Sequence, residues 1–540
     1  MITQSNSLAV AEPTWGLSNR LPGRGVLVLF AIAALTLGLI SATGGSAAAI
    51  DEWDNPVTVD STVRSGGVIP TVALSKDGSK ALAVWRARPT GGGNVYAAWW
   101  TPSGWSPVAT LGSGGSDTER TPSVALSADG SNAVVVWDRA DEDDPVPSYY
   151  SVQWARWTGA GWTPQTTLTA DAAGSSVSMS ADAATTVASW VSSAGQVKTS
   201  TMAGAVWQAP QTVATPFSNV ADTDVSVAAK ASGEAMLSWR QKDSASSGTS
   251  RVASAHLSSG VWSAVWLGPK SDAVLAPSME LSDNGSRAFL IWPYRKTSLS
   301  DAKLRAAVWK SGTWGSAQKL GKPTIDGSVA HLGLAASSSG KKAYAMWTTR
   351  SAGKSVITSS RWRKGSWSSS AKAGKGVNPQ VGLAGGEATA LWRGEWNAEH
   401  SVRTKVTSGS SWQAYQKIGK ASAWQPVSFA LAGDGATGMA VWSQGGRVKA
   451  SLLQRYGKAK KVKAKVSKKS KAKITWKQPS YATGAKVKLS KPNKKKFSSW
   501  KTVSKPKYAK TVKRGKKYWV KIKVTTPAGQ GPAVTKSFQS

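Results

Sequence analysis

Arginine recurs within three residues after tryptophan in this sequence. The segments WRAR, WDR, WRQ, WPYR, WTTR and WRGEW contain Arg86, Arg88, Arg139, Arg240, Arg295, Arg350, Arg393 and Trp396. A guanidinium presents several N–H donors in a fixed planar fork, which suits carboxylate and phosphate groups. If these segments share one face of the fold, they predict an arginine crown that binds an acidic ligand. The alternative is that each arginine ends a strand in solvent.

A second concentration of cations lies near the end of the sequence. Residues 457–540 contain 27 lysines and arginines and no aspartate or glutamate, within a chain of formal net charge +39. Lysine dominates, and a point charge favours nonspecific phosphate contact over base recognition. We therefore expect an anionic cell-wall polymer or acidic glycan as partner, and no specific nucleic acid, unless this surface is merely solvated. The candidate contact residues are Lys494, Lys495, Lys496, Lys513, Arg514, Lys516 and Lys517.

Signatures of catalysis and metal binding are absent from the sequence. Cysteine is absent, the three histidines (His256, His331 and His400) are about 70 residues apart, and neither GxSxG nor a P-loop occurs. We expect no cofactor, no metal and no catalytic residue. The one acidic cluster, Asp138 with residues 141–144, lacks the glycine and spacing of calcium loops, which favours a solvated loop over a Ca²⁺ site.

The tryptophans that precede the arginines end a repeated segment. VALSKDGSKALAVW, VALSADGSNAVVVW and MELSDNGSRAFLIW place apolar residues alternately on both sides of a turn, which predicts a hairpin. We expect these tryptophans to pack between neighbouring repeats. The same register gives Trp85, Trp137, Trp190, Trp239, Trp292, Trp347, Trp392 and Trp442.

A second hairpin follows each of these tryptophans, and its last strand also opens on tryptophan. Each unit of about 50 residues is therefore predicted to contain four strands and two tryptophans at fixed positions, as in a propeller blade. The second set contains Trp53, Trp105, Trp162, Trp207, Trp262, Trp314, Trp367 and Trp412.

The two ends of the repeated region complement each other. The first unit begins with DEWDNPVTVD, which matches the last strand of a unit, whereas the last unit stops after RVKASLL. Joining the two ends would remove both exposed edges. The sequence thus predicts an all-β fold in which residues 50–456 form an eight-bladed β-propeller closed by an N-terminal strand. The strand near Val57–Val59 would complete the blade built from residues 427–453.

The turns SKDG (75–78) and SADG (127–130) resemble the SPDG-like turn of TolB-type WD40-like repeats. The resemblance covers only the turn and strand pattern, so it implies a propeller and no particular function.

Composition changes abruptly after Tyr456. KAKITW and KKYWVKIKV alternate as strands, and Trp476, Tyr518 and the segment GQGP (529–532) resemble the second strand, the late tyrosine strand and the following loop of fibronectin type III domains. The resemblance implies a β-sandwich for residues 457–540. Two features depart from that family, because no acidic residue occurs and AKV (485–487) stands where a tyrosine is usual.

Residues 1–49 have the order of a secretory signal peptide. Arg20 and Arg24 precede the apolar run 26–40, and small residues end at Ala49, which predicts cleavage before Ile50. The apolar run of about 15 residues is shorter than the roughly 20 that span a bilayer, although an uncleaved anchor is the alternative. We expect a secreted monomer, free or associated with the cell surface, with no transmembrane segment in the mature chain.

Two classes of function fit these features. The first is a secreted, non-enzymatic binding or adhesion protein, in which the propeller recognises a ligand and the basic domain attaches to anionic envelope or matrix polymers. The second is a secreted carbohydrate-active enzyme, a glycosidase or lyase, with an accessory fibronectin type III domain. Paired acids at the ring centre would favour the enzyme. A third hypothesis, an assembly scaffold for envelope proteins, depends on the TolB-like turn alone, and the composition favours a bacterial source.

Overall fold

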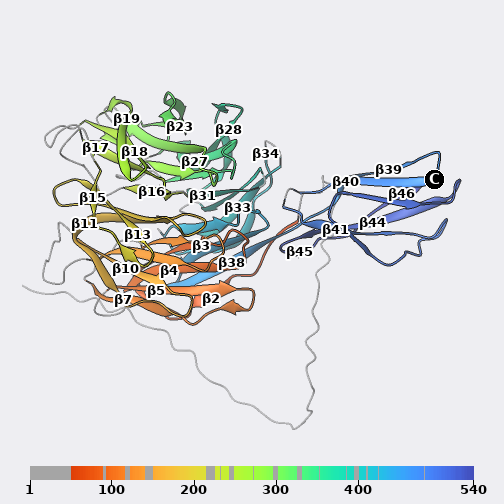
Figure 1. Ribbon diagram of the computed structural model, residues 1–540, viewed down its shortest axis with the longest axis horizontal. Coiled ribbons are helices and arrows are strands. Elements are labelled where there is room, and N and C mark those ends of the chain that lie inside the picture. Colours follow the sequence, from red (N-terminus) through yellow and green to blue (C-terminus); the bar gives the residue numbers. More distant parts are fainter. Residues whose placement is uncertain are drawn as a thin grey trace, which may run out of the picture. The chain divides into compact units, whose positions relative to one another are not determined.

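The computed structural model (Figure 1) describes residues 50–540 except 89–92, 116–121, 140–149, 214–224, 231–232, 243–248, 272, 296–301, 325–330, 352, 385, 395–399, 409–410, 424 and 480. All regular elements in these ranges are β-strands, so the predicted all-β class is confirmed. The described ranges contain no helix long and apolar enough to cross a bilayer. The predicted signal peptide 1–49, Trp396 and the acidic residues 141–144 lie outside them.

Residues 50–456 form antiparallel sheets from strands that follow one another along the chain. One sheet contains β3 (Ser65–Leu74), β4 (Ala81–Arg88), β5 (Gly93–Thr101), β6 (Gly104–Trp105) and β7 (Ala109–Gly115). The next two repeats share the long strand β11. They contain β8 (Ser123–Leu126), β9 (Ala133–Arg139), β10 (Tyr150–Trp157), β11 (Thr166–Met179), β12 (Thr186–Val191), β13 (Val197–Ala203), β14 (Val206–Trp207) and β15 (Gln211–Thr212).

The remaining repeats follow the same order. The next two sheets contain β16 (Ser226–Ala229), β17 (Ala235–Lys242), β18 (Ser250–Ser258) and β19 (Val261–Ser271), then β20 (Ala273–Val274), β21 (Ser278–Leu281), β22 (Arg287–Arg295), β23 (Lys303–Lys310), β24 (Thr313–Trp314) and β25 (Gln318–Gly321). Two more contain β26 (Leu332–Ala336), β27 (Lys342–Ser351), β28 (Lys354–Arg363), β29 (Ser366–Trp367) and β30 (Ala371–Lys375), then β31 (Val377–Ala384), β32 (Glu387–Arg393), β33 (Ser401–Ser408), β34 (Ser411–Trp412) and β35 (Gln416–Lys420).

The last repeated sheet combines strands from both ends of this region. It contains β36 (Val427–Leu431), β37 (Thr437–Gln444) and β38 (Arg447–Tyr456), and β38 also pairs with β1 (Ile50–Trp53) and β2 (Val57–Asp60). Val57 lies opposite Ala450, and Trp53 lies opposite Leu453. The N-terminal strands therefore cover the edge of β38, which would otherwise expose unpaired backbone groups.

The first strands of the repeats contact one another in a closed cycle. Within the described residues, β3 contacts β8, and the contacts continue through β11, β16, β21, β26, β31 and β36 back to β3. Serine hydroxyls strengthen several of these junctions by accepting backbone N–H groups. Ser428 Oγ accepts from Val72 N (3.2 Å), and Ser178 Oγ accepts from Ala229 N (3.0 Å).

The hairpin turns form a second set of links between repeats. Gly433 N donates to Lys76 O (2.9 Å), Lys76 N donates to Ala128 O (2.7 Å), and Ala128 N donates to Ala181 O (2.8 Å). In three of the described turns a serine and an aspartate fix the backbone: Ser75 with Asp77, Ser127 with Asp129, and Ser180 with Asp182. Ser127 Oγ donates to Asp129 Oδ1 (2.6 Å), and this hydrogen bond is the main reason why the pKa of Asp129 falls to about 2. The backbone hydrogen bond from Gly433 to Lys76 joins the last repeat to the first.

The first tryptophan set forms the centre of the core. All eight of these side chains are between 0% and 2% exposed, as predicted from the hairpin register. Burying an indole removes roughly 150–250 Å² from water, so these residues contribute strongly to packing. The second set is only partly buried, apart from Trp262, because its short strands lie at the sheet edges.

Glycines in the outer strands accommodate several of the buried indoles. A Cβ built at Gly374 in β30 would lie 2.6 Å from Cζ2 of Trp392 in β32, and one at Gly321 would lie 2.7 Å from Cζ2 of Trp347. Gly112, Gly268 and Gly419 make the same contact with the first-set tryptophan of the following repeat. Neighbouring sheets can therefore pack closely only where the outer strand lacks a side chain.

Residues 457–540 form two antiparallel sheets around one hydrophobic cluster. One sheet contains β39 (Lys460–Val466), β40 (Lys471–Lys477) and β43 (Lys507–Thr511). The other contains β41 (Gly484–Leu489), β42 (Lys501–Val503), β44 (Lys517–Thr526), β45 (Gly529–Gln530) and β46 (Val534–Gln539). Trp476 from the first sheet and Val487 and Ile522 from the second belong to the same cluster.

Candidate functional site

The predicted arginine crown separates into buried and exposed members. Arg86, Arg139, Arg240 and Arg295 are half-buried, Arg393 is 4% exposed, and Arg350 is exposed. Arg88 ends β4, but its side chain lies outside the described part of the chain. Each of these arginines lies within the last three residues of its strand, which is β4, β9, β17, β22, β27 or β32.

Two crown arginines bind the backbone of the next repeat. Arg240 Nη1 donates to Val274 O (2.9 Å), and Arg393 Nη1 donates to Gln425 O (3.4 Å). Burial lowers the pKa of both guanidinium groups from 12.5, although both stay charged at neutral pH. These two residues link neighbouring sheets, and Arg350 is the most exposed of the crown side chains that the structure describes.

The seven candidate cations of the C-terminal unit are all exposed. Lys494, Lys495 and Lys496 lie in the loop after β41, whereas Lys513, Arg514, Lys516 and Lys517 lie before or at the start of β44. We call these seven residues the basic patch. Because residues 457–540 contain no aspartate or glutamate, no acidic side chain of this unit neighbours the patch.

Backbone contacts bring the two halves of the basic patch together. Asn493 N donates to Lys517 O (2.8 Å), and Lys517 N donates to Asn493 Oδ1 (2.8 Å). Ser540 Oγ accepts from Lys516 N (3.0 Å) and so holds the second loop against the last strand. Loops that are separate in sequence thus present one continuous cationic surface, which concentrates the positive field.

Aromatic side chains lie beside the basic patch on the face of the second sheet. Lys521 Nζ lies 4.7 Å from the ring centre of Phe497, Lys488 Nζ lies 4.5 Å from that of Trp500, and Lys517 Nζ lies 5.5 Å from that of Trp519. Between them is an open groove of about 580 Å³ lined by Lys495, Phe497, Trp519, Lys521, Thr535 and Ser537.

The sequence-based site list did not contain this aromatic face. A signal for it exists in KKYWVKIKV, because strand alternation places Trp519 and Lys521 on the side opposite to the core residues Tyr518 and Val520. Phe497 and Trp500 follow the lysine run directly, but only the fold shows that they face β44.

The described first strands of the repeats contain two acids, Asp171 in β11 and Glu280 in β21. Asp171 accepts hydrogen bonds from Ser193 N (2.9 Å) and Ser193 Oγ (2.7 Å). The carboxyl group of Glu280 is surrounded by protein atoms, although the residue as a whole is only half-buried. Burial raises its pKa to about 8, and the charge of Asp283 adds to the shift. Within the described ranges, no group of three or more histidine, aspartate or glutamate side chains forms a potential metal-binding set.

Asp138, the described member of the predicted acidic cluster, has a structural contact. It is 1% exposed, and its carboxylate accepts hydrogen bonds from Gly174 N (2.8 Å) and Ser175 N (3.1 Å) in β11. The side chain therefore fixes the bend of β11 between two repeats. The other acids of the cluster, residues 141–144, are not in the described ranges.

No protein-family model matches the chain, and no curated protein matches it. Among solved structures, the WD40 domain of SCAP from fission yeast is similar at 9% identity over 75% of this chain and 98% of that chain, with a TM-score of 0.43. The β-propeller domain of the Trilobed protease from Pyrococcus furiosus is similar at 9% identity over 65% and 98%, with a TM-score of 0.39. Kuenenia stuttgartiensis hydrazine synthase is similar at 12% identity over 70% and 94%, also with a TM-score of 0.39. These likenesses concern the fold alone.

Proposed function

We propose that this chain is an exported binding protein of bacterial origin, held by its C-terminal unit at anionic polymers of a cell envelope or matrix. The observation that carries the proposal is the basic patch, in which seven exposed cations are gathered within a unit that has 27 lysines and arginines and no acid. A secretory signal at residues 1–49 and a monomeric mature chain belong to the same proposal.

The repeated region is proposed to be an eight-bladed β-propeller. The closed cycle of contacts among β3, β8, β11, β16, β21, β26, β31 and β36 supports this arrangement. Pairing of β1 and β2 with β38 supports closure by the N-terminal strands. A propeller closed in this way is rigid, and its loops are free to recognise a ligand.

The C-terminal unit is proposed to be a fibronectin type III domain. Its sheets have the strand orders β39-β40-β43 and β42-β41-β44-β46, which suit a seven-stranded sandwich. The hydroxyl of Tyr518 accepts a hydrogen bond from Lys513 N (2.9 Å), the backbone contact expected of a tyrosine corner. Trp476 lies in the second strand, β40.

The proposed attachment is electrostatic and tolerant of sequence. Exposed ammonium groups bind repeated phosphates or carboxylates with little geometric demand, and each contact releases counterions from the polymer. Trp500, Trp519 and Phe497 would add contact area for the rings or backbone of the polymer.

The test is retention of the exported chain on a purified anionic cell-wall polymer across a salt series. A variant with the seven patch residues changed to glutamine should bind at least tenfold more weakly near 0.15 M salt and should show a shallower dependence on salt. The matched control changes seven exposed lysines of the repeated region to glutamine: Lys310, Lys319, Lys341, Lys354, Lys364, Lys372 and Lys375.

The two variants lose the same charge, so a general effect of net charge would weaken both equally and contradict a local site. Equal binding of the patch variant and the unaltered chain would also reject the proposal. N-terminal sequencing of the exported chain tests the signal peptide separately, with Ile50 expected as the first residue.

A further inference from the structure

A pocket of about 750 Å³ lies between two neighbouring repeats, on β18, β19, β23 and β24. Three indoles line it, from Trp266, Trp309 and Trp314. Polar groups come from Ser254, His256 and Arg305. A pocket with several aromatic walls and a few polar groups has the composition of a small-ligand site.

One contact that joins two other repeat pairs is missing at this pocket. In two other repeat pairs, a second-set tryptophan closes the same gap: Trp262 Nε1 donates to Thr199 Oγ1 (3.0 Å), and Trp412 Nε1 donates to Ser359 Oγ (2.9 Å). In the same register, Trp314 should donate to Ser254. Ser254 Oγ instead donates to Leu237 O (2.8 Å), and no hydrogen bond joins it to Trp314 in the described part of the chain.

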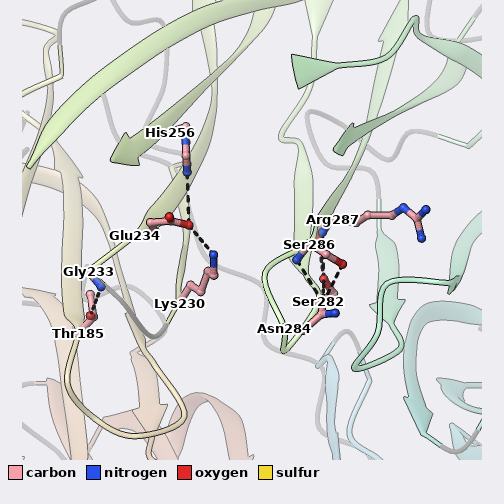
Figure 2. A network of polar contacts seen from close by, with 9 residues as sticks. All are labelled: Thr185, Lys230, Gly233, Glu234, His256, Ser282, Asn284, Ser286 and Arg287. Atoms are coloured by element: carbon pink, nitrogen blue, oxygen red, sulfur yellow. Dashed lines mark hydrogen bonds and ion pairs between the residues drawn. The ribbon is translucent and has the colours of Figure 1, made fainter. Parts of the chain in front are cut away.

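A polar network orients the imidazole on one wall of the pocket (Figure 2). The ring of His256 lies 5.1 Å from the ring of Trp309, and His256 Nε2 lies 3.9 Å from Glu234 Oε2. Lys230 Nζ donates to the same carboxylate oxygen at 2.6 Å. The hydrogen bond from Lys230 is the main cause that holds the pKa of Glu234 below its ordinary value, so this carboxylate stays charged behind the histidine.

Arg305 lies in β23, across the pocket from His256 in β18. Its guanidinium carbon lies 4.8 Å from the ring centre of Tyr294, which holds the side chain in place. Its Nε is buried and has no hydrogen-bond partner among the described residues. The residue as a whole is half-buried and lines the pocket, so its guanidinium is the cationic group that a ligand oxygen would meet there.

We infer that this pocket binds one pyranose unit of a glycan. The flat C–H face of a pyranose fits against an indole, and its hydroxyl oxygens accept hydrogen bonds from Arg305 and His256. An apolar ligand would leave these polar groups unpaired, which disfavours it. This site lies in the repeated region and uses none of the basic patch.

The test uses the full exported chain and two soluble probes, a methyl hexopyranoside and a methyl hexuronoside, titrated by calorimetry at 0.5 M NaCl. High salt suppresses contacts to the basic patch, so failure of the patch proposal does not affect this measurement. Arg305→Ala and Trp266→Ala should each weaken binding at least tenfold. Preference for the uronoside would identify a sugar carboxylate at Arg305, and preference for the hexoside would identify hydroxyl recognition.

Arg403 provides the matched control. It occupies the same register position, nine residues before the second-set tryptophan, but Nε donates to Ser401 Oγ (2.9 Å) and its guanidinium lies 5.2 Å from the ring of Tyr415. Arg403→Ala should leave sugar binding within twofold. Failure of both probes to bind, or equal losses in Arg305→Ala and Arg403→Ala, would overturn the inference.

Discussion

Lys76 Nζ lies 3.0 Å from Asp283 Oδ2, so the hairpin turns of two repeats that share no strand pairing meet through their side chains. Lys76 also belongs to the chain of backbone links between turns, since its carbonyl accepts from Gly433 N. The turns of the first, fifth and last repeats therefore converge. Contacts among these three hairpin turns are expected if the repeats form a ring and their turns all lie on the same face of that ring.

The Lys76–Asp283 pair should contribute little to stability. The side chains are 51% and 41% exposed, and ion pairs at such positions contribute about 0–1 kcal/mol. A double-mutant cycle with Lys76→Ala and Asp283→Ala, measured by denaturant unfolding, should give a coupling energy below about 1 kcal/mol that decreases with salt. A coupling well above about 2 kcal/mol would mean that the pair is far less solvated than its exposure indicates.

Gly374→Ala should destabilise the repeated region by about 1–3 kcal/mol, because the new methyl group meets the buried Trp392 indole at 2.6 Å. Gly161→Ala is the matched control, since a Cβ there meets nothing within 4 Å. Calorimetric Tm values of the two variants check this prediction. A Tm for Gly374→Ala equal to that of the control would show that the sheets separate without cost.

Removing Arg393 should cost more stability than removing Arg350. Arg393 is buried and donates to Gln425 O, whereas Arg350 is exposed. Arg393→Ala should lower the free energy of unfolding by about 1–3 kcal/mol, and Arg350→Ala should change it by less than about 0.5 kcal/mol. If Arg350→Ala weakens ligand binding without changing unfolding, the crown acts as a binding surface at that residue. Equal stability losses would contradict the division into buried and exposed members.

Glu280 should make stability fall as the pH rises. Its pKa is raised from an ordinary 4.5 to about 8, so the folded state keeps its proton where the unfolded state has lost it. The contribution of Glu280 to the free energy of unfolding is fully present below about pH 4.5, and it is lost as the pH rises through about 8. Glu280→Gln, which cannot ionise, should therefore raise Tm by a few degrees at pH 8 and by less at pH 5. Parallel Tm profiles of the two proteins between pH 4 and 9 would contradict the assignment.

Local patterns were enough to predict the strands and the core tryptophans. The hairpin register of Trp85, Trp137 and their equivalents depends on alternation within about 14 residues, and all eight side chains are buried. The match between the start and the end of the repeated region likewise predicted the pairing of Val57 with β38. The partial burial of the second tryptophan set was not predictable in the same way, since it depends on which strand ends each sheet.

By itself, the sequence determined the all-β class, the repeat, the buried tryptophans and the cationic character of residues 457–540, because these follow from periodicity and composition. Only the tertiary structure decided that Arg393 binds a neighbouring repeat, that Asn493 and Lys517 join two lysine loops, and that the gap beside Ser254 stays open. The physical reason is that each of these features depends on one hydrogen bond between segments distant in the chain. The geometry of such a bond is set by sheet packing, which local periodicity does not encode.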